Sequence, residues 1–269
     1  MSTHASELRR SEAVVIIPMY NERENAAAII DAVLALEAPF DVLVVDDNSP
    51  DGTAAIVREK MDASPGRVSL ISRAGKLGLG TAYIEGFRRA LDMGYEYICE
   101  MDADFSHNPA DLLRLLRRAR TDADMVVGSR YVSGVNVVNW PMGRVLMSFY
   151  ASKYVRLVTG MPVHDTTAGF VCYRRRVLEA LPLDAIRFKG YAFQIEMKYT
   201  AYKYGFRVVE EPIVFVNRVL GTSKMNTGIF GEAMFGVIRL KWDSLFRKYP
   251  DYSTKNKDCW LLFLFIMRR

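Results

Sequence analysis

Short apolar runs rich in β-branched residues recur along the first half of the chain, and each is followed by turn residues. All but the last then continue into a stretch with the pattern of a helix. The runs cover residues 13–17, 42–45, 68–71, 97–101 and 125–127. This alternation predicts βαβ units and an α/β fold with a mainly parallel, Rossmann-like sheet. Because the runs are nearly continuous in Val, Ile and Leu, we expect helices on both faces of that sheet.

Helices are predicted between these strands, over 24–37, 53–61, 81–93 and 109–120. The last of them starts with Pro109 after Asn108, which is a typical signal for a helix N-terminus. In open parallel sheets, ligands bind outside the carboxyl ends of the strands. We therefore expect the chemistry of this chain in the residues that directly follow each strand.

Composition places the chain among ordinary globular proteins, since 50% of its 269 residues are hydrophobic and 25% are charged. Its longest uninterrupted apolar run, 260–267, is far shorter than the roughly 20 residues of a membrane-spanning helix. The N-terminus lacks a basic stretch leading into an apolar core, so we expect no secretory signal and a cytoplasmic location. Cys99, Cys172 and Cys259 lack the spacing of metal ligands and are expected to be packing residues.

Six carboxylates follow three of the predicted strands. They are Glu22, Asp46, Asp47, Asp51, Asp102 and Asp104. We expect these groups to converge on one rim of the sheet, which costs free energy unless a cation or hydrogen-bond donors compensate. Each one taken alone is equally well explained as a helix cap or a turn residue.

Asp102 and Asp104 form an Asp-x-Asp pair directly beyond a buried strand. Hard divalent cations such as Mg²⁺ or Mn²⁺ take oxygen ligands and keep positions free for phosphates. The pair therefore predicts a site for a metal–diphosphate. The nearby His107 is expected to be a cap or surface residue outside the metal shell.

Several common enzyme motifs are missing from the sequence. No G-x-G-x-x-G follows the first run, no G-x-x-x-x-G-K-[ST] occurs, and the glycine-rich stretch 75–80 has the wrong spacing for either. That stretch is interpreted as a turn into the helix at Thr81 or as a loop beside a ligand. A hydrolase is poorly supported, because there is no G-x-S-x-G and the three histidines offer no evident triad.

Acidic residues are missing from one long segment of the chain. No Asp or Glu occurs between positions 125 and 164, although Arg130, Arg144, Lys153 and Arg156 do. Such a segment favours an anionic neighbour.

The segment 227–269 carries a net charge of +4, from eight Lys or Arg against four Asp or Glu. Within it, 229–247 mixes apolar and basic residues in a pattern that suits either a lipid headgroup boundary or packing on the domain core. The apolar residues are Phe230, Met234, Ile238, Trp242, Leu245 and Phe246, and the basic ones are Arg239, Lys241 and Arg247. The run 260–267, followed by two arginines, suits lipid or a membrane-embedded partner, with an oligomer interface as the alternative.

Eight segments, taken in order, resemble the family-2 GT-A glycosyltransferases, and within them the dolichol-phosphate (polyprenol-phosphate) mannose synthases. The segments are 18–22, 45–53, 76–80, 102–107, 128–130, 165–170, 191–196 and 218–224. The resemblance implies a GT-A fold for the glycosyltransferase domain, which we expect over 13–226. We expect an N-terminal extension over 1–12 before it and, from the charge and apolar pattern, a basic amphipathic membrane- or partner-binding segment over 227–269 after it. One departure is Ser106, which stands where some relatives have Gln, so we expect no third protein ligand to the metal there.

The same resemblance implies roles for individual residues. A nucleotide-sugar pocket would be lined by Pro18, Tyr20, Glu22, Val45, Asp46, Asp47, Asp102, Ala103, Asp104, Arg218 and Lys224. Asp102 and Asp104 would hold Mg²⁺ or Mn²⁺, and Arg130 with Arg144 would bind the acceptor phosphate. Asp104 and Arg130 are the implied catalytic residues.

The implied reaction is the inverting transfer of mannose from GDP-mannose to a polyprenyl (dolichyl-type) monophosphate, which gives a β-linked sugar phosphate. A phosphate monoester has a second pKa of about 6, so the acceptor is largely ionised near neutral pH and no general base is obligatory. A UDP-glucose donor, a soluble enzyme with a non-lipid acceptor, and a sugar-nucleotide-binding regulator without turnover are the alternatives. The implied location is peripheral, on the cytoplasmic face of a membrane. Contact would be made through 143–159 and the C-terminal segment or through a small integral membrane subunit, and no nucleic-acid partner is expected.

Overall fold

A computed structural model describes residues 11–190, 192–218 and 229–253, with side chains of the last range from Met234 onward. Of the predicted N-terminal extension 1–12, only Ser11 and Glu12 fall within this part of the chain. Cys259 and the apolar run 260–267 lie outside it.

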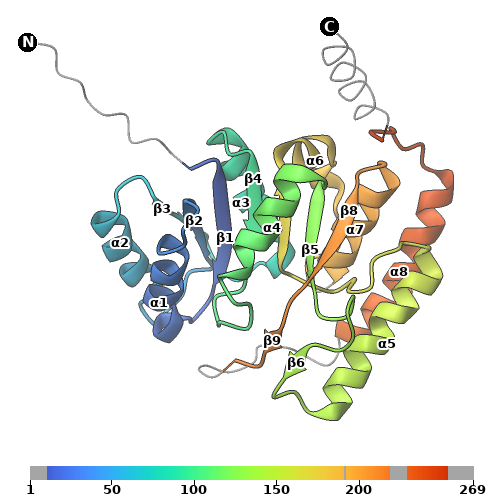
Figure 1. The fold of residues 1–269 in the computed structure, drawn as a ribbon, viewed down its shortest axis with the longest axis horizontal. Coiled ribbons are helices and arrows are strands. Elements are labelled where there is room, and N and C mark those ends of the chain that lie inside the picture. Colours follow the sequence, from blue (N-terminus) through green and yellow to red (C-terminus); the bar gives the residue numbers. More distant parts are fainter. Residues whose placement is uncertain (1–10, 191, 219–228, 254–269) are drawn as a thin grey trace, which may run out of the picture.

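Seven strands form the central sheet in the order β3-β2-β1-β4-β7-β5-β8 (Figure 1). In chain order they are β1 (Ala13–Met19), β2 (Phe40–Asp46), β3 (Val68–Ser72), β4 (Tyr97–Glu100), β5 (Met125–Ser129), β7 (Val171–Arg174) and β8 (Val208–Pro212). Neighbours pair in parallel, except that β7 lies antiparallel between β4 and β5. The mainly parallel sheet and the five predicted strands are confirmed. The short strands β6 (Val137–Val138) and β9 (Phe215–Val216) form a separate parallel pair.

Helices cover both faces of this sheet, as the continuous apolar runs predict. They are α1 (Arg23–Leu34), α2 (Thr53–Ala63), α3 (Leu79–Asp92), α4 (Asp111–Thr121), α5 (Met142–Thr159), α6 (Arg175–Ala180), α7 (Ala192–Lys203) and α8 (Ile229–Phe246), with a 3₁₀ turn over Leu183–Ala185. Side chains of β1 alternate between two cores, since Val15 and Ile17 pack with α1 and α4, while Val14 and Ile16 pack with α3 and α7. Full burial of each such side chain contributes about 1.5–3 kcal/mol.

The four predicted helices are confirmed, with ends shifted by a few residues. Helix α4 begins at Asp111, two residues later than predicted, because Asn108 and Pro109 form a turn before it. The glycine-rich stretch is a turn into α3, which is one of its two interpretations. Gly78 has a φ of 106° there, and a Cβ at this position would lie 3.1 Å from the carbonyl oxygen of Lys189. A residue with a side chain would therefore strain this turn.

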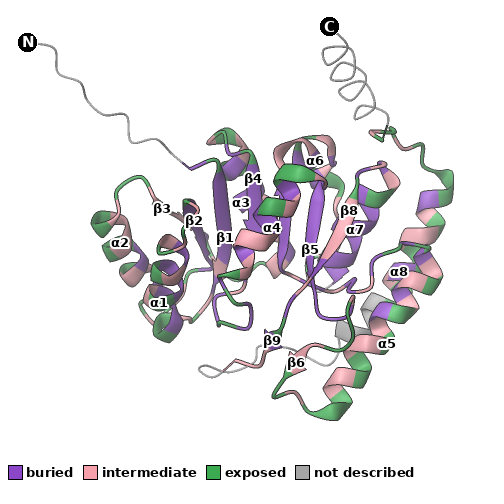
Figure 2. Cartoon of the chain, in the orientation of Figure 1, coloured by how far each residue is buried: buried purple, intermediate pink, exposed green. Residues whose placement is uncertain are grey.

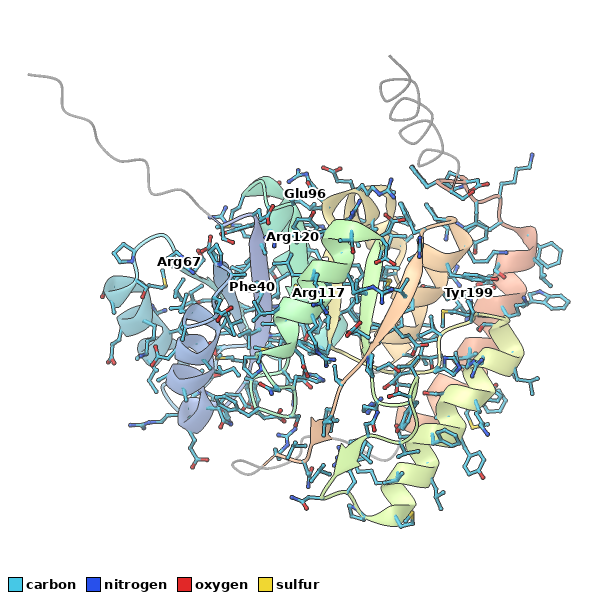
Figure 3. All side chains as sticks on the ribbon, in the orientation of Figure 1. Phe40, Arg67, Glu96, Arg117, Arg120 and Tyr199 are labelled. Carbon is cyan, nitrogen blue, oxygen red and sulfur yellow. The ribbon has the colours of Figure 1, made fainter. Side chains whose placement is uncertain are left out.

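Helices α5 and α8 pack against each other at one side of the sheet (Figure 1). Tyr199 of α7, labelled in Figure 3, shares a hydrogen bond of 2.7 Å with Ser244 and so joins α7 to α8. Figure 2 shows exposed residues spread along both paired helices, between half-buried and buried ones. The large apolar side chains exposed there define the α5–α8 surface, and they are Met142, Leu146, Met147, Tyr150, Leu157, Met234, Phe235, Ile238, Trp242, Leu245 and Phe246. Among the described helices, none combines the length and the apolar character needed to cross a membrane.

Candidate active site

The residues that follow β1, β2, β4 and β5 meet at one edge of the sheet, at the bottom of Figure 1. A cavity of about 620 Å³ lies at this edge. Its lining combines carboxylates, arginines and apolar side chains from helices α5 and α8. The lining residues that matter below are Asp102, Asp104, His107, Arg130, Trp140, Arg144, Met147, Tyr154, Gln194, Arg218 and Val237. One cavity thus joins three chemically different surfaces.

Asp102 and Asp104 follow β4 and open onto this cavity. Burial in the cavity wall raises the pKa of Asp102 to about 7, and the carboxylate of Asp104 adds to the shift. Glu22 acts in the same direction. Close carboxylates with a raised pKa favour a bound cation, and their oxygens fit Mg²⁺ or Mn²⁺. No group of three or more His, Cys, Asp or Glu side chains within the described residues is placed to hold a metal, so other ligand positions would fall to substrate and water.

Arg218 supplies a positive charge beside these carboxylates. Its Nη2 lies 2.8 Å from Asp104 Oδ2, while the Ser106 N–H donates to Asp104 Oδ1 at 3.0 Å. In the free protein, Arg218 therefore compensates a carboxylate charge that a bound metal would compensate instead. Lys224, predicted beside Arg218 at the donor diphosphate, lies outside the described residues.

The two carboxylates at the end of β2 have separate partners. Asp46 accepts hydrogen bonds from the N–H and the Oγ of Ser49, at 3.1 and 2.6 Å, and so holds the turn after the strand. Asp47 pairs with Arg73 Nη1 at 2.7 Å, and burial nevertheless raises the pKa of Asp47. Asp47 is the better candidate for contact with a nucleotide base or ribose, because both oxygens of Asp46 are used by the turn.

Asp51 is placed as a cap rather than as a site residue. Its Oδ1 accepts hydrogen bonds from the N–H and the Oγ1 of Thr53, at 3.0 and 2.6 Å, where α2 begins. Its Oδ2 accepts the Arg23 N–H at 3.1 Å, which ties the turns after β1 and β2 together. The expected convergence of all six carboxylates is therefore only partial.

The remaining residues predicted for the nucleotide pocket differ in how far their side chains are buried. Pro18 and Val45 are register partners on β1 and β2, and the Val45 side chain is fully buried in the core, which leaves its main chain as the part that would line a nucleotide pocket. Ala103 is also buried, with 4% of its surface exposed. Tyr20 is half-buried, and Lys76 Nζ lies 5.0 Å from the centroid of its ring.

Arg130 follows β5 and is fixed by a buried carboxylate. Its Nε and Nη2 donate to the two oxygens of Asp165 at 2.7 and 2.6 Å. Nη2 also donates to Thr167 Oγ1 at 2.9 Å. The acid-free segment of the sequence predicts Arg130, but it ends one residue before Asp165 and gives no sign of this pair.

Arg144, the second arginine predicted to bind an acceptor phosphate, reaches the same cavity. Its guanidinium carbon lies 4.0 Å from the centroid of the Trp140 ring, and its Nη1 donates to Asn217 Oδ1 at 3.2 Å. The guanidinium carbon of Arg130 is 5.5 Å from the same ring. Two arginines thus flank one tryptophan, a residue that sequence reasoning missed although it stands in the acid-free segment between them.

His107 is buried, so its predicted place at a cap or on the surface is wrong. Its ring stacks on Phe170 with centroids 4.8 Å apart, and the Asp102 N–H donates to its Nδ1 at 3.4 Å. Burial lowers the pKa of His107 to about 4, so the imidazole is neutral near neutral pH. The histidine packs the turn that carries the carboxylate pair.

A chain of buried polar groups lies behind the cavity. Gln194 Nε2 donates to Glu100 Oε2 at 2.5 Å, and Lys198 Nζ donates to Gln194 Oε1 at 3.2 Å. Lys198 Nζ also donates to the Ala168 carbonyl at 2.6 Å. Burial raises the pKa of Glu100 to about 7 and lowers that of Lys198 to about 8. These bonds tie the strand before Asp102 to the loop that follows Asp165.

Comparison with known sequences identifies close relatives. The sequence model described as Glycosyl transferase family 2 matches residues 14–181. A polyprenol monophosphomannose synthase of Mycolicibacterium smegmatis is 49% identical over 224 residues, which cover 83% of this chain and 84% of that protein. An undecaprenyl-phosphate mannosyltransferase of Micrococcus luteus is 46% identical over 236 residues, which cover 86% of this chain and 96% of that protein.

Solved structures share the fold at much lower identity. A glucosyl-3-phosphoglycerate synthase of Mycobacterium tuberculosis, in complex with Mn²⁺, UDP and glucosyl-3-phosphoglycerate, has a TM-score of 0.62 at 18% identity, over 90% of this chain and 82% of that one. A mannosyltransferase of Pyrobaculum calidifontis, in complex with GDP-Man and Mn²⁺, has a TM-score of 0.57 at 20% identity, over 93% of this chain and 68% of that one. These likenesses establish the arrangement of sheet and helices alone.

Proposed function

The chain belongs to glycosyl transferase family 2 and has the GT-A fold, and from this premise we propose that it transfers mannose from GDP-mannose to a polyprenyl monophosphate. The two relatives at 46–49% identity are named for mannosyl transfer to polyprenyl phosphates. Those relatives carry more weight than structures at 18% identity, so mannose is favoured over the UDP-glucose alternative. The observation that carries the proposal is one cavity that joins a carboxylate pair, two arginines and an apolar helix pair.

The carboxylate end of the cavity suits the diphosphate of a nucleotide sugar. Asp102 and Asp104 would hold Mg²⁺ or Mn²⁺, which stabilises the negative charge that develops on the leaving diphosphate. Arg218 is paired with Asp104 in the free protein and would turn to the diphosphate once that carboxylate has another cation. Asp47 and Tyr20 would contact the nucleoside.

The arginine end of the cavity suits the phosphate of the acceptor. Asp165 holds Nε and Nη2 of Arg130, so the guanidinium is already ordered and binding costs little side-chain entropy. Beyond it the cavity is lined by apolar side chains such as Met147, Tyr154 and Val237, which suit the first units of a prenyl chain.

The reaction follows from these positions. An oxygen of the acceptor phosphate attacks the anomeric carbon, the bond to the diphosphate breaks, and the configuration at that carbon inverts. Because the attacking phosphate is already an anion, no base has to remove a proton. Among the described lining residues, Asp102 and Asp104 are the only carboxylates, and both would be engaged by the metal. A hydroxyl acceptor would need a further base, so this lining favours a phosphate acceptor.

The α5–α8 surface supports a peripheral location on a membrane. Exposed fractions are 86% for Leu157, 78% for Phe235 and 62% for Trp242, and soluble monomers seldom leave so many large apolar side chains of two packed helices uncovered. Arg156 and Arg239 stand on the same helices and suit anionic headgroups. Met147 and Met234 belong both to this surface and to the cavity lining, so a prenyl phosphate would enter the site directly from the bilayer. A small integral membrane subunit would use the same surface.

Transfer is tested with radiolabelled GDP-mannose, Mn²⁺ and a polyprenyl phosphate in detergent. We expect a labelled lipid product that requires the prenyl phosphate, with UDP-glucose as the matched donor control. The variant Arg117→Ala, on the exposed side of α4, serves as a control that keeps activity. Faster transfer from UDP-glucose, or release of sugar to water at the same rate without prenyl phosphate, would overturn the proposal.

A further inference from the structure

The indole of Trp140 has a hydrogen-bond donor that the fold leaves unused. Its Nε1–H is buried, yet it has no hydrogen-bond partner within the described part of the chain. An indole nitrogen can donate a hydrogen bond but cannot accept one. A buried donor without an acceptor is destabilising, and native proteins keep few of them. Because Trp140 lines the cavity, the missing acceptor is best sought on a molecule that enters it.

The surroundings of this indole favour an anion. The guanidinium carbons of Arg144 and Arg130 lie 4.0 and 5.5 Å from the ring centroid. Helix α5 starts at Met142, two residues after the tryptophan, and the N-terminus of a helix adds positive potential. A phosphate oxygen is therefore a better acceptor here than a neutral carbonyl or hydroxyl group.

The charge balance explains why a neutral donor is useful at this place. The charge of Arg130 is matched by the buried carboxylate of Asp165, whose Oδ1 lies 2.6 Å from Arg130 Nη2, while Arg144 donates to the neutral side-chain amide of Asn217. A further arginine would also attract the diphosphate of the sugar donor. An indole N–H strengthens the binding of one phosphate without adding charge.

We infer that Trp140 Nε1–H donates a hydrogen bond to the phosphate of the acceptor, as a third binding group beside Arg130 and Arg144. The inference rests on the proposed function. Solvent does not reach Nε1 in the free protein, so an oxygen reaches it only when a neighbouring side chain moves. The guanidinium carbon of the half-buried Arg144 lies 4.0 Å from the ring centroid, and a shift of this long side chain is the movement that the inference requires.

The test is a titration of the full chain, labelled with ¹⁵N at its tryptophan indoles, with farnesyl phosphate. The chain has three tryptophans, so three indole N–H resonances are expected, and the one absent from Trp140→Phe is assigned to Trp140. That resonance should move downfield as farnesyl phosphate binds, and inorganic phosphate should produce the same change only at higher concentration.

Trp140→Phe keeps an aromatic ring between the arginines and should weaken farnesyl phosphate binding about 10- to 100-fold, as expected for a hydrogen bond to a charged group. Arg117→Ala, on the exposed side of α4, should leave the affinity unchanged.

Three outcomes would overturn the inference. In the first, farnesyl phosphate binds and shifts other resonances while the Trp140 indole stays unchanged, and the proposed function then stands without it. In the second, the indole responds to GDP and not to farnesyl phosphate, which would move the residue to the donor site. In the third, farnesyl phosphate does not bind and no labelled lipid forms in the transfer assay, which would remove the proposed function together with the inference.

Discussion

Asp165→Asn is expected to lower the free energy of unfolding by about 3–5 kcal/mol, because it removes one partner of a buried ion pair. Asp165 is 0% exposed and accepts three hydrogen bonds from Arg130, from its N–H, Nε and Nη2, at 2.9, 2.7 and 2.6 Å. The substitution changes the volume of the side chain very little. It leaves the charge of Arg130 buried without compensation and turns one acceptor into a donor that faces other donors.

The measurement is urea unfolding at pH 7 of the wild type and the variant. Glu12→Gln is the matched control, because its pair with Arg120 has side chains 47% and 43% exposed and should contribute less than about 1 kcal/mol. The double variant Arg130→Met/Asp165→Leu removes both charges and should recover most of the loss. A loss for Asp165→Asn as small as that of the control would refute the view that this carboxylate anchors the arginine.

Four further predictions concern the carboxylate end of the cavity, the stability of the fold and the exposed helix surface. Asp104→Asn should abolish Mn²⁺-dependent binding of GDP in calorimetry while leaving the circular dichroism spectrum unchanged; transfer at the wild-type rate in EDTA would contradict the metal role. Arg218→Gln should weaken GDP binding about tenfold with little effect on farnesyl phosphate, and equal losses would show that the donor and acceptor ends are assigned wrongly. The pKa of His107 falls from an unfolded value of about 6.5 to about 4, so the unfolded state binds more protons between these values. The stability of the wild type relative to His107→Gln should therefore fall by about 3 kcal/mol as the pH drops from 6.5 to 4, because the raised pKa values of Asp102 and Glu100 act in the opposite direction in both proteins; a constant difference between the two profiles would contradict the burial argument. Phe235→Ser/Trp242→Ser should reduce flotation with anionic liposomes, and equal flotation of variant and wild type would exclude this surface as the membrane contact.

The strands and helices of the first half of the chain can be predicted because each is encoded locally. The apolar runs and the helices between them follow the periods of the backbone itself, and the structure reproduces them within a few residues. Strand β7 was not predicted, because Val171–Arg174 is only four residues long and its place between β4 and β5 depends on contacts distant in the sequence. A short strand inserted by tertiary pairing leaves little local signal.

The parts of the candidate site that depend on local sequence were also predictable, whereas the contacts that depend on the folded chain were not. The strand ends correctly placed Asp102 and Asp104 at the cavity. Whether a carboxylate faces the cavity or its own backbone depends on the turn that follows, and Asn48, with a φ of 60°, bends the chain so that Asp46 meets Ser49. The partner of an arginine 35 residues away, as Asp165 is for Arg130, is a property of the folded chain.

The antiparallel insertion of β7 also fixes when the sheet can be completed during synthesis. Strand β4 ends at Glu100, yet its neighbour β7 begins at Val171, roughly seventy residues later. At ribosomal rates of about 5–20 residues per second, one edge of β4 stays unpaired for on the order of ten seconds, and β5 also emerges before its neighbour. A nascent chain at this stage exposes one edge of β4 and both edges of β5, whose neighbours β7 and β8 follow later, and such edges are the usual starting points of association between chains. Chaperone binding to ribosome-bound chains is therefore expected to concentrate on lengths that stop short of β7.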